Sequence, residues 1–180
     1  MHTYEWYLIK NFYTLAECNE VIEICRNYPS NKLKDNPSLS KKVNTVIVEL
    51  NKFDAKLDKL YRQAVHINQM WFGFKIYDQR PKGVNFNVYE KDLNEYPYHK
   101  DFNPHGTLSD LKLTVVLNLS IDEYEGGYLE FFNGGDDRLD TFNSIGDLLI
   151  FPSFNFHRVT PVTRGTRMTL STWLEGPNLK

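Results

Sequence analysis

The sequence predicts a mainly β fold with flanking α-helices, in which a small antiparallel barrel is braced by N-terminal helices. His99 and Asp101 stand at positions i and i+2, so a strand would point both side chains to the same side. The segments 147–152 and 154–160 predict two short strands joined at a proline, and the second strand would bring His157 to that side. Apolar residues at helical spacing in the first third of the chain predict the bracing helices.

Length and composition set the frame for this fold. A chain of 180 residues with 41% apolar residues is most simply one globular domain with a real core. We expect a single domain over residues 1–180, with supporting helices and strands in 1–83 and the barrel core in 84–175. The net charge of −2, without a basic run, does not indicate nucleic-acid binding. The N-terminus has no signal-peptide pattern and no stretch approaches a membrane span, so we expect a cytoplasmic protein without a membrane partner.

The first third of the chain is expected to support the barrel. A strand over 5–10 precedes Thr14 and Glu17, whose spacing is that of a capping box at the start of a helix. Apolar residues follow at helical spacing to an expected helix end near Asn27. The polar segment 29–42 is expected to form a loop, which a strand over 43–50 follows.

A second helix is expected over residues 53–69. Its apolar residues form one stripe, so both helices should pack against the outer face of one sheet. The aromatic-rich segment 71–77 predicts a strand, and 78–83 predicts a hairpin loop before a strand over 85–89.

Most cysteines and histidines have ordinary structural explanations. Cys18 and Cys25 would lie roughly 10 Å apart along the first helix at 1.5 Å per residue, so they cannot pair and are expected to be small buried apolar residues. His2 is terminal and His66 is helical. His105 lies in a turn-rich stretch, where a surface position is expected, and is the only rival to the metal ligands described next.

Two imidazoles and one carboxylate, from His99, Asp101 and His157, form a candidate metal site. This ligand set suits a mononuclear, non-haem iron(II) centre, because it occupies one face of an octahedron and leaves the other open for a co-substrate and dioxygen. Arg167, ten residues beyond His157, can hold the far carboxylate of a dicarboxylic acid, since its planar guanidinium matches a carboxylate and stays charged. The rival Arg164 lies in an expected turn and should be solvated, whereas Arg167 begins an expected strand.

Further pieces of the sequence accompany this triplet in a fixed order. They are Tyr89, Tyr96-Pro-Tyr-His-Lys-Asp101, Leu117-Asn-Leu119, Glu125-Gly-Gly-Tyr-Leu-Glu-Phe-Phe132, Gly146-Asp-Leu-Leu-Ile-Phe-Pro152, and His157-Arg-Val-Thr-Pro161 continuing through Arg167 to Trp173. With this order and spacing, the segment 84–173 resembles the prolyl 4-hydroxylase-like branch of the 2-oxoglutarate and iron(II)-dependent dioxygenases. The resemblance covers about half the chain and implies a double-stranded β-helix barrel of the jelly-roll, cupin-like type.

The resemblance also implies a role for each site residue. It makes His99, Asp101 and His157 the iron ligands and catalytic centre, and it pairs Arg167 with the C5 carboxylate of 2-oxoglutarate. Tyr89 corresponds to a tyrosine that hydrogen-bonds the co-substrate, and Leu129 corresponds to an apolar wall beside it. Core packing alone would also explain Tyr89 and Leu129.

The reaction implied by the resemblance is hydroxylation of an unactivated C–H bond. Iron(II), 2-oxoglutarate and dioxygen would take part, succinate and carbon dioxide would be released, and ascorbate is a candidate reductant. The leading substrate is a prolyl residue of a peptide or protein, and the alternative is a free amino acid or other small molecule. The loop 78–83 corresponds to a lid in related hydroxylases, although a plain solvated turn explains it equally well.

Some features leave other classes open. Val116 stands where some prolyl hydroxylases have a tyrosine that helps to bind the C5 carboxylate, so Arg167 would have fewer helpers. Gly126 and Gly127 are explained by backbone geometry at a turn or bulge.

The ligand set also suits a zinc or manganese lyase or isomerase, because ligand type alone does not fix the metal. A non-catalytic binding module is a further alternative, and the intact triplet with its arginine argues against it.

Overall fold

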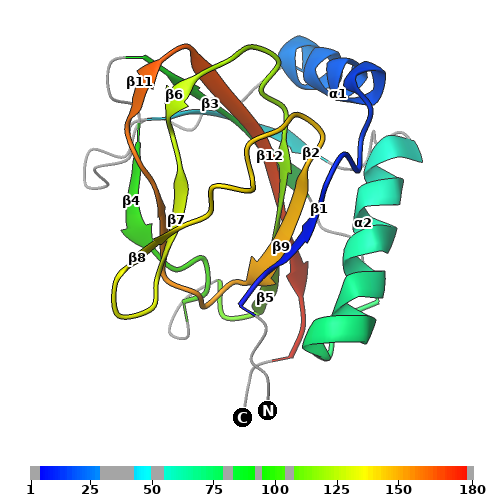
Figure 1. Ribbon diagram of the computed structural model, residues 1–180. Helices are drawn as coiled ribbons and strands as arrows, with labels where there is room; N and C mark the ends of the chain where they lie inside the picture. The colour runs from blue at the N-terminus through cyan, green and yellow to red at the C-terminus, as the bar shows by residue number, and fades with distance from the viewer. Residues whose placement is uncertain are drawn as a thin grey trace.

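The computed structural model describes residues 5–28, 43–49, 55–78, 83–91, 95–103 and 108–177. Two antiparallel sheets face each other around a barrel, and two helices lie outside the larger sheet (Figure 1). This arrangement confirms the predicted mainly β fold with flanking helices.

The larger sheet has six strands, and the smaller sheet has four. The larger sheet runs in the order β1 (Tyr7–Ile9), β9 (Leu148–Pro152), β5 (Leu111–Asn118), β12 (Thr166–Glu175), β3 (Gly83–Glu90) and β2 (Asn44–Glu49). The smaller sheet runs β4 (Tyr96–His99), β10 (His157–Val159), β7 (Leu129–Phe132) and β8 (Asp136–Arg138). A two-stranded ribbon of β11 (Val162–Arg164) and β6 (Glu125–Gly126) closes one side of the barrel.

The first helix, α1 (Leu15–Asn27), begins and ends where the sequence predicts. The backbone N–H of Glu17 donates to Thr14 Oγ1 at 3.2 Å, and the Thr14 N–H donates to Glu17 Oε2 at 2.8 Å. These two bonds satisfy groups that the helix itself leaves unpaired, and they confirm the capping box.

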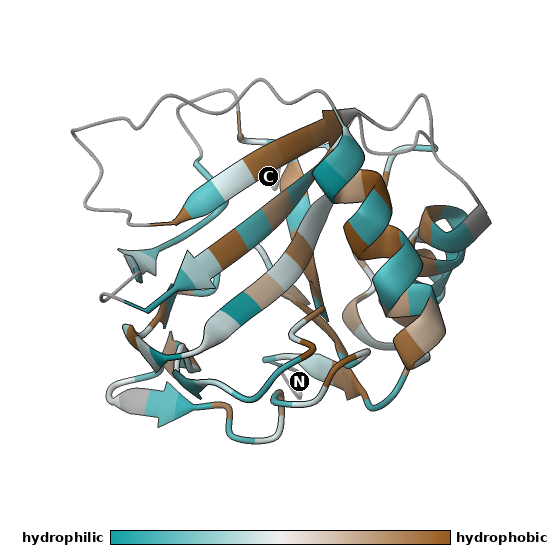
Figure 2. Cartoon of the chain, turned by 90° about the horizontal axis from the view of Figure 1, so that it is seen from above, coloured by the Kyte–Doolittle hydropathy of each residue, from teal (hydrophilic) through white to brown (hydrophobic). Residues whose placement is uncertain are grey.

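Strand alternation produces two apolar layers from one sheet. In β5, Leu113, Val115 and Leu117 point outward and pack with buried side chains of α1 and α2 (Ala55–Ile67). Val116, between them in sequence, points inward and belongs to a second cluster between the two sheets. Figure 2 shows apolar segments both on the strands and along the adjoining helices. The helices therefore brace the outer face of the larger sheet, as the apolar stripes predict.

Both cysteines lie in the outer layer. Cys18 and Cys25 are buried and free, and burial raises the pKa of their thiols to about 11 and about 12 respectively. A thiol that stays protonated is a poor nucleophile. The cysteines thus act as small apolar residues, as expected.

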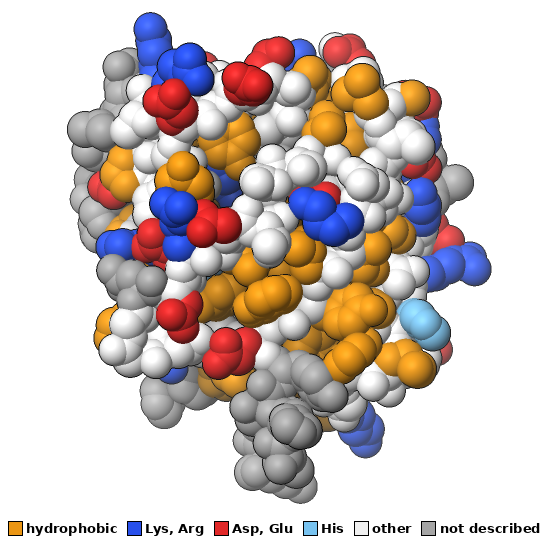
Figure 3. Space-filling model, in the orientation of Figure 1, with side chains coloured by type: hydrophobic (Ala, Val, Ile, Leu, Met, Phe, Trp, Pro, Cys, Tyr) orange, Lys and Arg blue, Asp and Glu red, His pale blue; other side chains and the backbone are white. Residues whose placement is uncertain are grey.

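Several large apolar side chains remain at the surface. Figure 3 shows such side chains among acidic and basic ones on the face seen in Figure 1. Three aromatic residues of the smaller sheet and its loops, Tyr98, Phe132 and Phe156, contact one another with ring centroids 5.1 to 6.1 Å apart.

No helix in the described part of the chain is long and apolar enough to cross a membrane.

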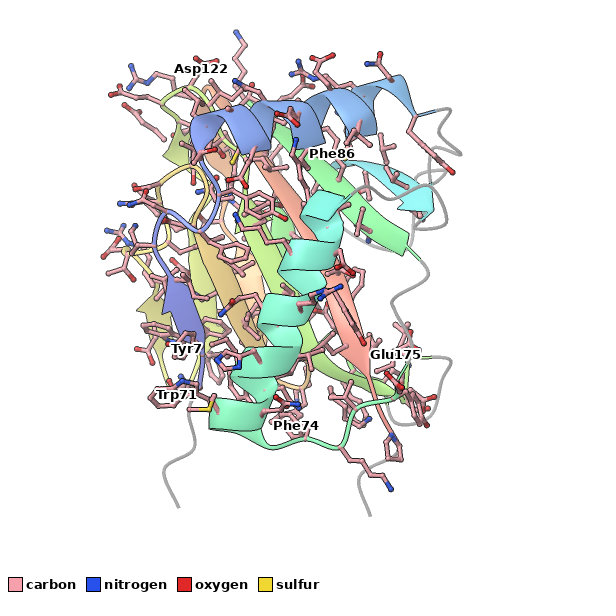
Figure 4. All side chains as sticks on the ribbon, turned by 90° about the vertical axis from the view of Figure 1, so that its right-hand side faces the viewer. Tyr7, Trp71, Phe74, Phe86, Asp122 and Glu175 are labelled. Carbon is pink, nitrogen blue, oxygen red and sulfur yellow. The ribbon has the colours of Figure 1, made fainter. Side chains whose placement is uncertain are left out.

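The strand predicted over 71–77 is wrong. After α2 the chain continues as one π-helical turn, η2 (Asn68–Phe72), which ends at Gly73 with φ of 70°. Beyond it, the amide of Asn68 bonds both backbone groups of Phe74, at 2.8 and 3.0 Å, in place of a strand partner. Trp71 packs its ring 5.1 Å from that of Tyr7 beside the end of α2 (Figure 4). Aromatic enrichment alone does not distinguish a strand from a packed helix end.

Some predictions fall on segments that the structure does not describe. The loop over 29–42 lies outside the described residues, as do residues 79–82 of the candidate lid. The same holds for His2 and for His105, the rival ligand.

The capping box gives a test of the fold. Thr14→Ala should lower the free energy of unfolding by about 1 kcal/mol, because it removes the acceptor for the Glu17 N–H. Urea titration followed by circular dichroism measures the change. Thr14→Ser keeps the hydroxyl and should stay within a few tenths of a kcal/mol of the wild type. Equal loss in both variants would contradict a capping role.

Candidate metal centre and co-substrate pocket

Pairing of two short strands brings the two histidines together. His99 is the last residue of β4 and His157 is the first of β10, and the register places them opposite each other. Their ring centroids lie 4.2 Å apart. Asp101 was expected on the same strand as His99, but β4 ends at His99 and Asp101 lies in the bend that follows. The bend still directs its carboxylate to the histidines.

One ligand atom from each of the three residues converges on a common point. These atoms all lie within 4.8 Å of one another, with His99 Nε2 3.4 Å from Asp101 Oδ1 and His157 Nε2 3.9 Å from Asp101 Oδ2. Each Nδ1 lies within 2.9 Å of a backbone carbonyl oxygen two residues earlier in the chain. A carbonyl only accepts, so Nδ1 carries the proton and Nε2 keeps its lone pair for a metal.

The aspartate is fixed by two residues of the larger sheet. Thr114 Oγ1 donates to Asp101 Oδ2 at 2.6 Å, and Trp173 Nε1 donates to the same oxygen at 3.0 Å. Thr114 and Trp173 are partners across β5 and β12. No pattern in the sequence indicates Thr114, whereas alternation along β12 places Trp173 on the correct face.

The electrostatics of the site favour the forms that bind a metal. Burial by itself raises the pKa of Asp101, but the neighbouring His99 and His157 imidazoles and the hydrogen bond from Thr114 outweigh it and lower that pKa to about 2. Burial lowers the pKa of His157 to about 4, although Asp101 opposes the change. At neutral pH the carboxylate is therefore ionised and the His157 imidazole is neutral, as a metal site requires.

A pocket extends from this cluster along β12. Its four inward side chains, Arg167, Thr169, Ser171 and Trp173, all line the pocket, which confirms that they share a face. The neighbouring strand β3 adds polar side chains and Tyr89, while the other walls are apolar. The apolar lining consists of Val116, Leu129, Phe151 and Val159.

Arg167 is a buried arginine that faces the pocket. Its side chain is 3% exposed, and no carboxylate in the described ranges forms an ion pair with it. Its guanidinium carbon lies 5.0 Å from the centroid of the Tyr89 ring, on the strand paired with β12. Arg164 is exposed and pairs with Glu125 at 2.9 Å, as expected for a solvated residue. Because a buried charge is costly when unpaired, the pocket fits a ligand that brings a carboxylate to Arg167.

Comparison with known proteins shows which family this chain belongs to. Residues 84–175 match the model of the 2OG-Fe(II) oxygenase superfamily. The chain belongs to this superfamily. Its members use iron(II), 2-oxoglutarate and dioxygen, and the three converging ligands and the buried Arg167 fit the metal and the co-substrate.

Named relatives of this chain are PKHD-type hydroxylases. A PKHD-type hydroxylase of Xylella fastidiosa (strain 9a5c) is 35% identical over 104 residues, which cover 50% of this chain and 43% of the relative. This chain thus spans less than half the length of that relative. A PKHD-type hydroxylase of Azoarcus sp. (strain BH72) is 30% identical over 166 residues, which cover 86% of this chain and 69% of the relative.

Solved structures confirm the double-stranded β-helix fold of this chain. A Pseudomonas putida prolyl-4-hydroxylase aligns with a TM-score of 0.74 at 19% identity, covering 98% of this chain and 95% of that one. The viral collagen prolyl hydroxylase of Paramecium Bursaria Chlorella virus-1 aligns with a TM-score of 0.72 at 15% identity, covering 96% and 97%.

The support of Asp101 can be tested through metal affinity. Thr114→Val removes the hydroxyl that donates to Asp101 but keeps the shape, so the Kd for Mn(II) should rise about 10-fold or more. Thr172→Val is the matched control, because that hydroxyl bonds the Gly83 carbonyl and not Asp101. Calorimetric titration measures both affinities. Equal weakening in the two variants would show that Thr114 has no special role at the metal.

Proposed function

We propose that this chain is a 2-oxoglutarate- and iron(II)-dependent dioxygenase that hydroxylates a prolyl residue of a peptide or protein and releases succinate and carbon dioxide. One observation carries the proposal: the cluster of His99, Asp101 and His157 shares a pocket with a buried Arg167 that forms no ion pair with any carboxylate among the described residues. A metal and a dicarboxylate together satisfy both features.

Each part of the pocket has a task in this reaction. The two Nε2 atoms and the Asp101 carboxylate hold the metal, with Thr114 and Trp173 fixing the carboxylate. Bound iron(II), with 2-oxoglutarate and dioxygen, supplies the oxidising chemistry. Arg167 binds the C5 carboxylate, which orients the co-substrate along β12.

The remaining walls hold the co-substrate in place and exclude water. Tyr89 lies beside the guanidinium of Arg167 and is buried, and burial raises the pKa of its hydroxyl, so that hydroxyl stays protonated and can donate a hydrogen bond. Leu129 and Val116 present apolar surface for the methylene groups. Val116 offers no hydrogen bond, so Arg167 and Tyr89 are the anchor of the carboxylate.

The substrate class is supported by the resemblance to the prolyl 4-hydroxylase-like branch and by the prolyl hydroxylases among the structural neighbours. One structural neighbour, from Trichoplax adhaerens, is a prolyl hydroxylase in complex with a hypoxia inducible factor oxygen degradation domain peptide fragment (TM-score 0.65, 16% identity). A free amino acid or other small molecule is the second candidate. It is favoured by the polar side chains of Asn85, Asn87 and Ser171 in the pocket wall, which can bind a charged or polar group directly.

Anaerobic addition of iron(II) and 2-oxoglutarate to the apoprotein tests the co-substrate. A weak visible charge-transfer band of the chelate should form in the wild type and be lost in His99→Ala and Asp101→Ala. Arg167→Ala should need at least about 10-fold more 2-oxoglutarate, because it loses a charge-assisted bidentate contact. Arg164→Ala, which removes an exposed arginine, should titrate like the wild type. Tight iron binding without a band would exclude 2-oxoglutarate as the co-substrate.

The substrate class needs a separate assay. The iron-loaded protein should add one oxygen atom to proline-containing peptides and form an equal amount of succinate. Mass spectrometry of the peptides and chromatography of succinate measure the two products. Free L-proline and other free amino acids serve as the comparison, and oxidation of these alone would favour the small-molecule candidate.

A further inference from the structure

Gly127 lies where the chain passes closest to the stem of Arg167. It follows β6, has a φ of 61°, and its N–H donates to the carbonyl of Pro161 at 3.0 Å. The next residue, Tyr128, donates its N–H to Thr160 Oγ1 at 2.8 Å and accepts the Thr160 N–H at 2.9 Å. These bonds fix the position of the Gly127 backbone against the segment that leads into β12.

A side chain at residue 127 would collide with Arg167. A Cβ atom there would lie 2.8 Å from Arg167 Cδ and 2.9 Å from Val162 Cγ2, closer than such atoms normally approach. Val162 is fully buried and Arg167 is nearly so, and close packing around buried side chains resists a shift of either one. The Cδ atom is also in the middle of the arginine side chain, so its displacement would carry the guanidinium with it.

The head of the same arginine is placed by Tyr89. Its guanidinium carbon lies 5.0 Å from the Tyr89 ring centroid, and Tyr89 and Arg167 are partners across β3 and β12. Gly127 therefore sets the path of the stem, while Tyr89 contacts the head. A shift of the stem changes where the guanidinium meets a carboxylate.

We infer that Gly127 is a positioning residue for co-substrate binding: its missing side chain lets the backbone pass beside the stem of Arg167, which keeps the guanidinium in the pocket that the metal ligands line. The inference rests on the proposed function, in which Arg167 binds the C5 carboxylate. It gives Gly127 a part in the chemistry beyond the backbone geometry that its sequence context explains. It also predicts that co-substrate affinity and metal affinity respond differently to a change at this position.

Gly127→Ala tests the inference, with Gly134→Ala as the matched control. Gly134 has a φ of 89° and nothing within 4 Å of a Cβ placed on it, so both variants force alanine into a positive φ and only one reaches Arg167. The probes are Mn(II) and 2-oxoglutarate, titrated by calorimetry into the full chain. Gly127→Ala should raise the Kd for 2-oxoglutarate at least about 10-fold, since misplacement by about 1 Å is costly, and should leave the Kd for Mn(II) within about twofold. Gly134→Ala should leave both constants unchanged.

A second pair of variants distinguishes the positioning of Arg167 from a general disturbance of the fold. In an Arg167→Ala background, adding Gly127→Ala should weaken 2-oxoglutarate binding by less than about twofold, because the two changes act through one contact. If Gly127→Ala does not fold, Gly127→Ala with Val162→Ala takes its place, since loss of the Val162 methyl groups makes room for one of the two contacts.

The outcomes that overturn the inference are distinct from failure of the proposed function. Wild-type binding of 2-oxoglutarate together with equal binding by Gly127→Ala overturns the positioning role alone. Parallel loss of Mn(II) and 2-oxoglutarate affinity in Gly127→Ala also overturns it, because the effect would not pass through Arg167. A wild type that binds Mn(II) but no 2-oxoglutarate overturns the proposed function, and the inference with it.

Discussion

The antiparallel pairing of β4 with β10 is the constraint on which the rest of the site depends. Its register sets His157 opposite His99, and side chains alternate between the two faces of a strand. A slip of one residue would turn an imidazole from the barrel interior to the outer surface. The same alternation sends the neighbouring Tyr98 and Phe156 outward, where their rings stack at 5.1 Å. The pairing is thus held from both faces of the smaller sheet.

The metal centre also joins the two sheets. Asp101 follows β4 of the smaller sheet, but its carboxylate is held by Thr114 and Trp173 of the larger sheet. On the opposite face of β5, Leu113 and Val115 pack with the helices. The apolar layer beneath α1 and α2 therefore fixes the strand that positions the ligand, which explains why a barrel site needs support from helices on its outer side.

Local patterns in the sequence were sufficient for much of this description. The capping box located the start of α1, and the spacing of the apolar residues located both helices. His99 and Asp101 are predicted from residue type and short spacing, and His157 is predicted from its expected strand and the ordered motifs around it; the structure brings all three together.

Features that depend on contacts between distant segments cannot be predicted from local sequence patterns. Thr114 contacts Asp101 only because β5 and β12 pair in one register and the chain bends after β4. The π-helical turn over 68–72 was predicted in part as strand, since aromatic side chains suit either conformation and the amide of Asn68 decides between them. The contact of Gly127 with Arg167 depends on the position of a backbone and leaves no trace in residue type.

The buried Arg167 gives the pocket a thermodynamic role in the folded state. Enclosing a guanidinium that pairs with no carboxylate of the described segments weakens the ligand-free protein, and a bound dicarboxylate relieves that penalty. Ligand occupancy and resistance to unfolding are therefore linked by mass action, and a ligand present at 100 times its Kd adds about 2.7 kcal/mol to stability. A substitution that neutralised Arg167 would make the empty barrel more robust while removing the charge that attracts the ligand. Part of the stability of this fold is thus supplied by the molecule it binds.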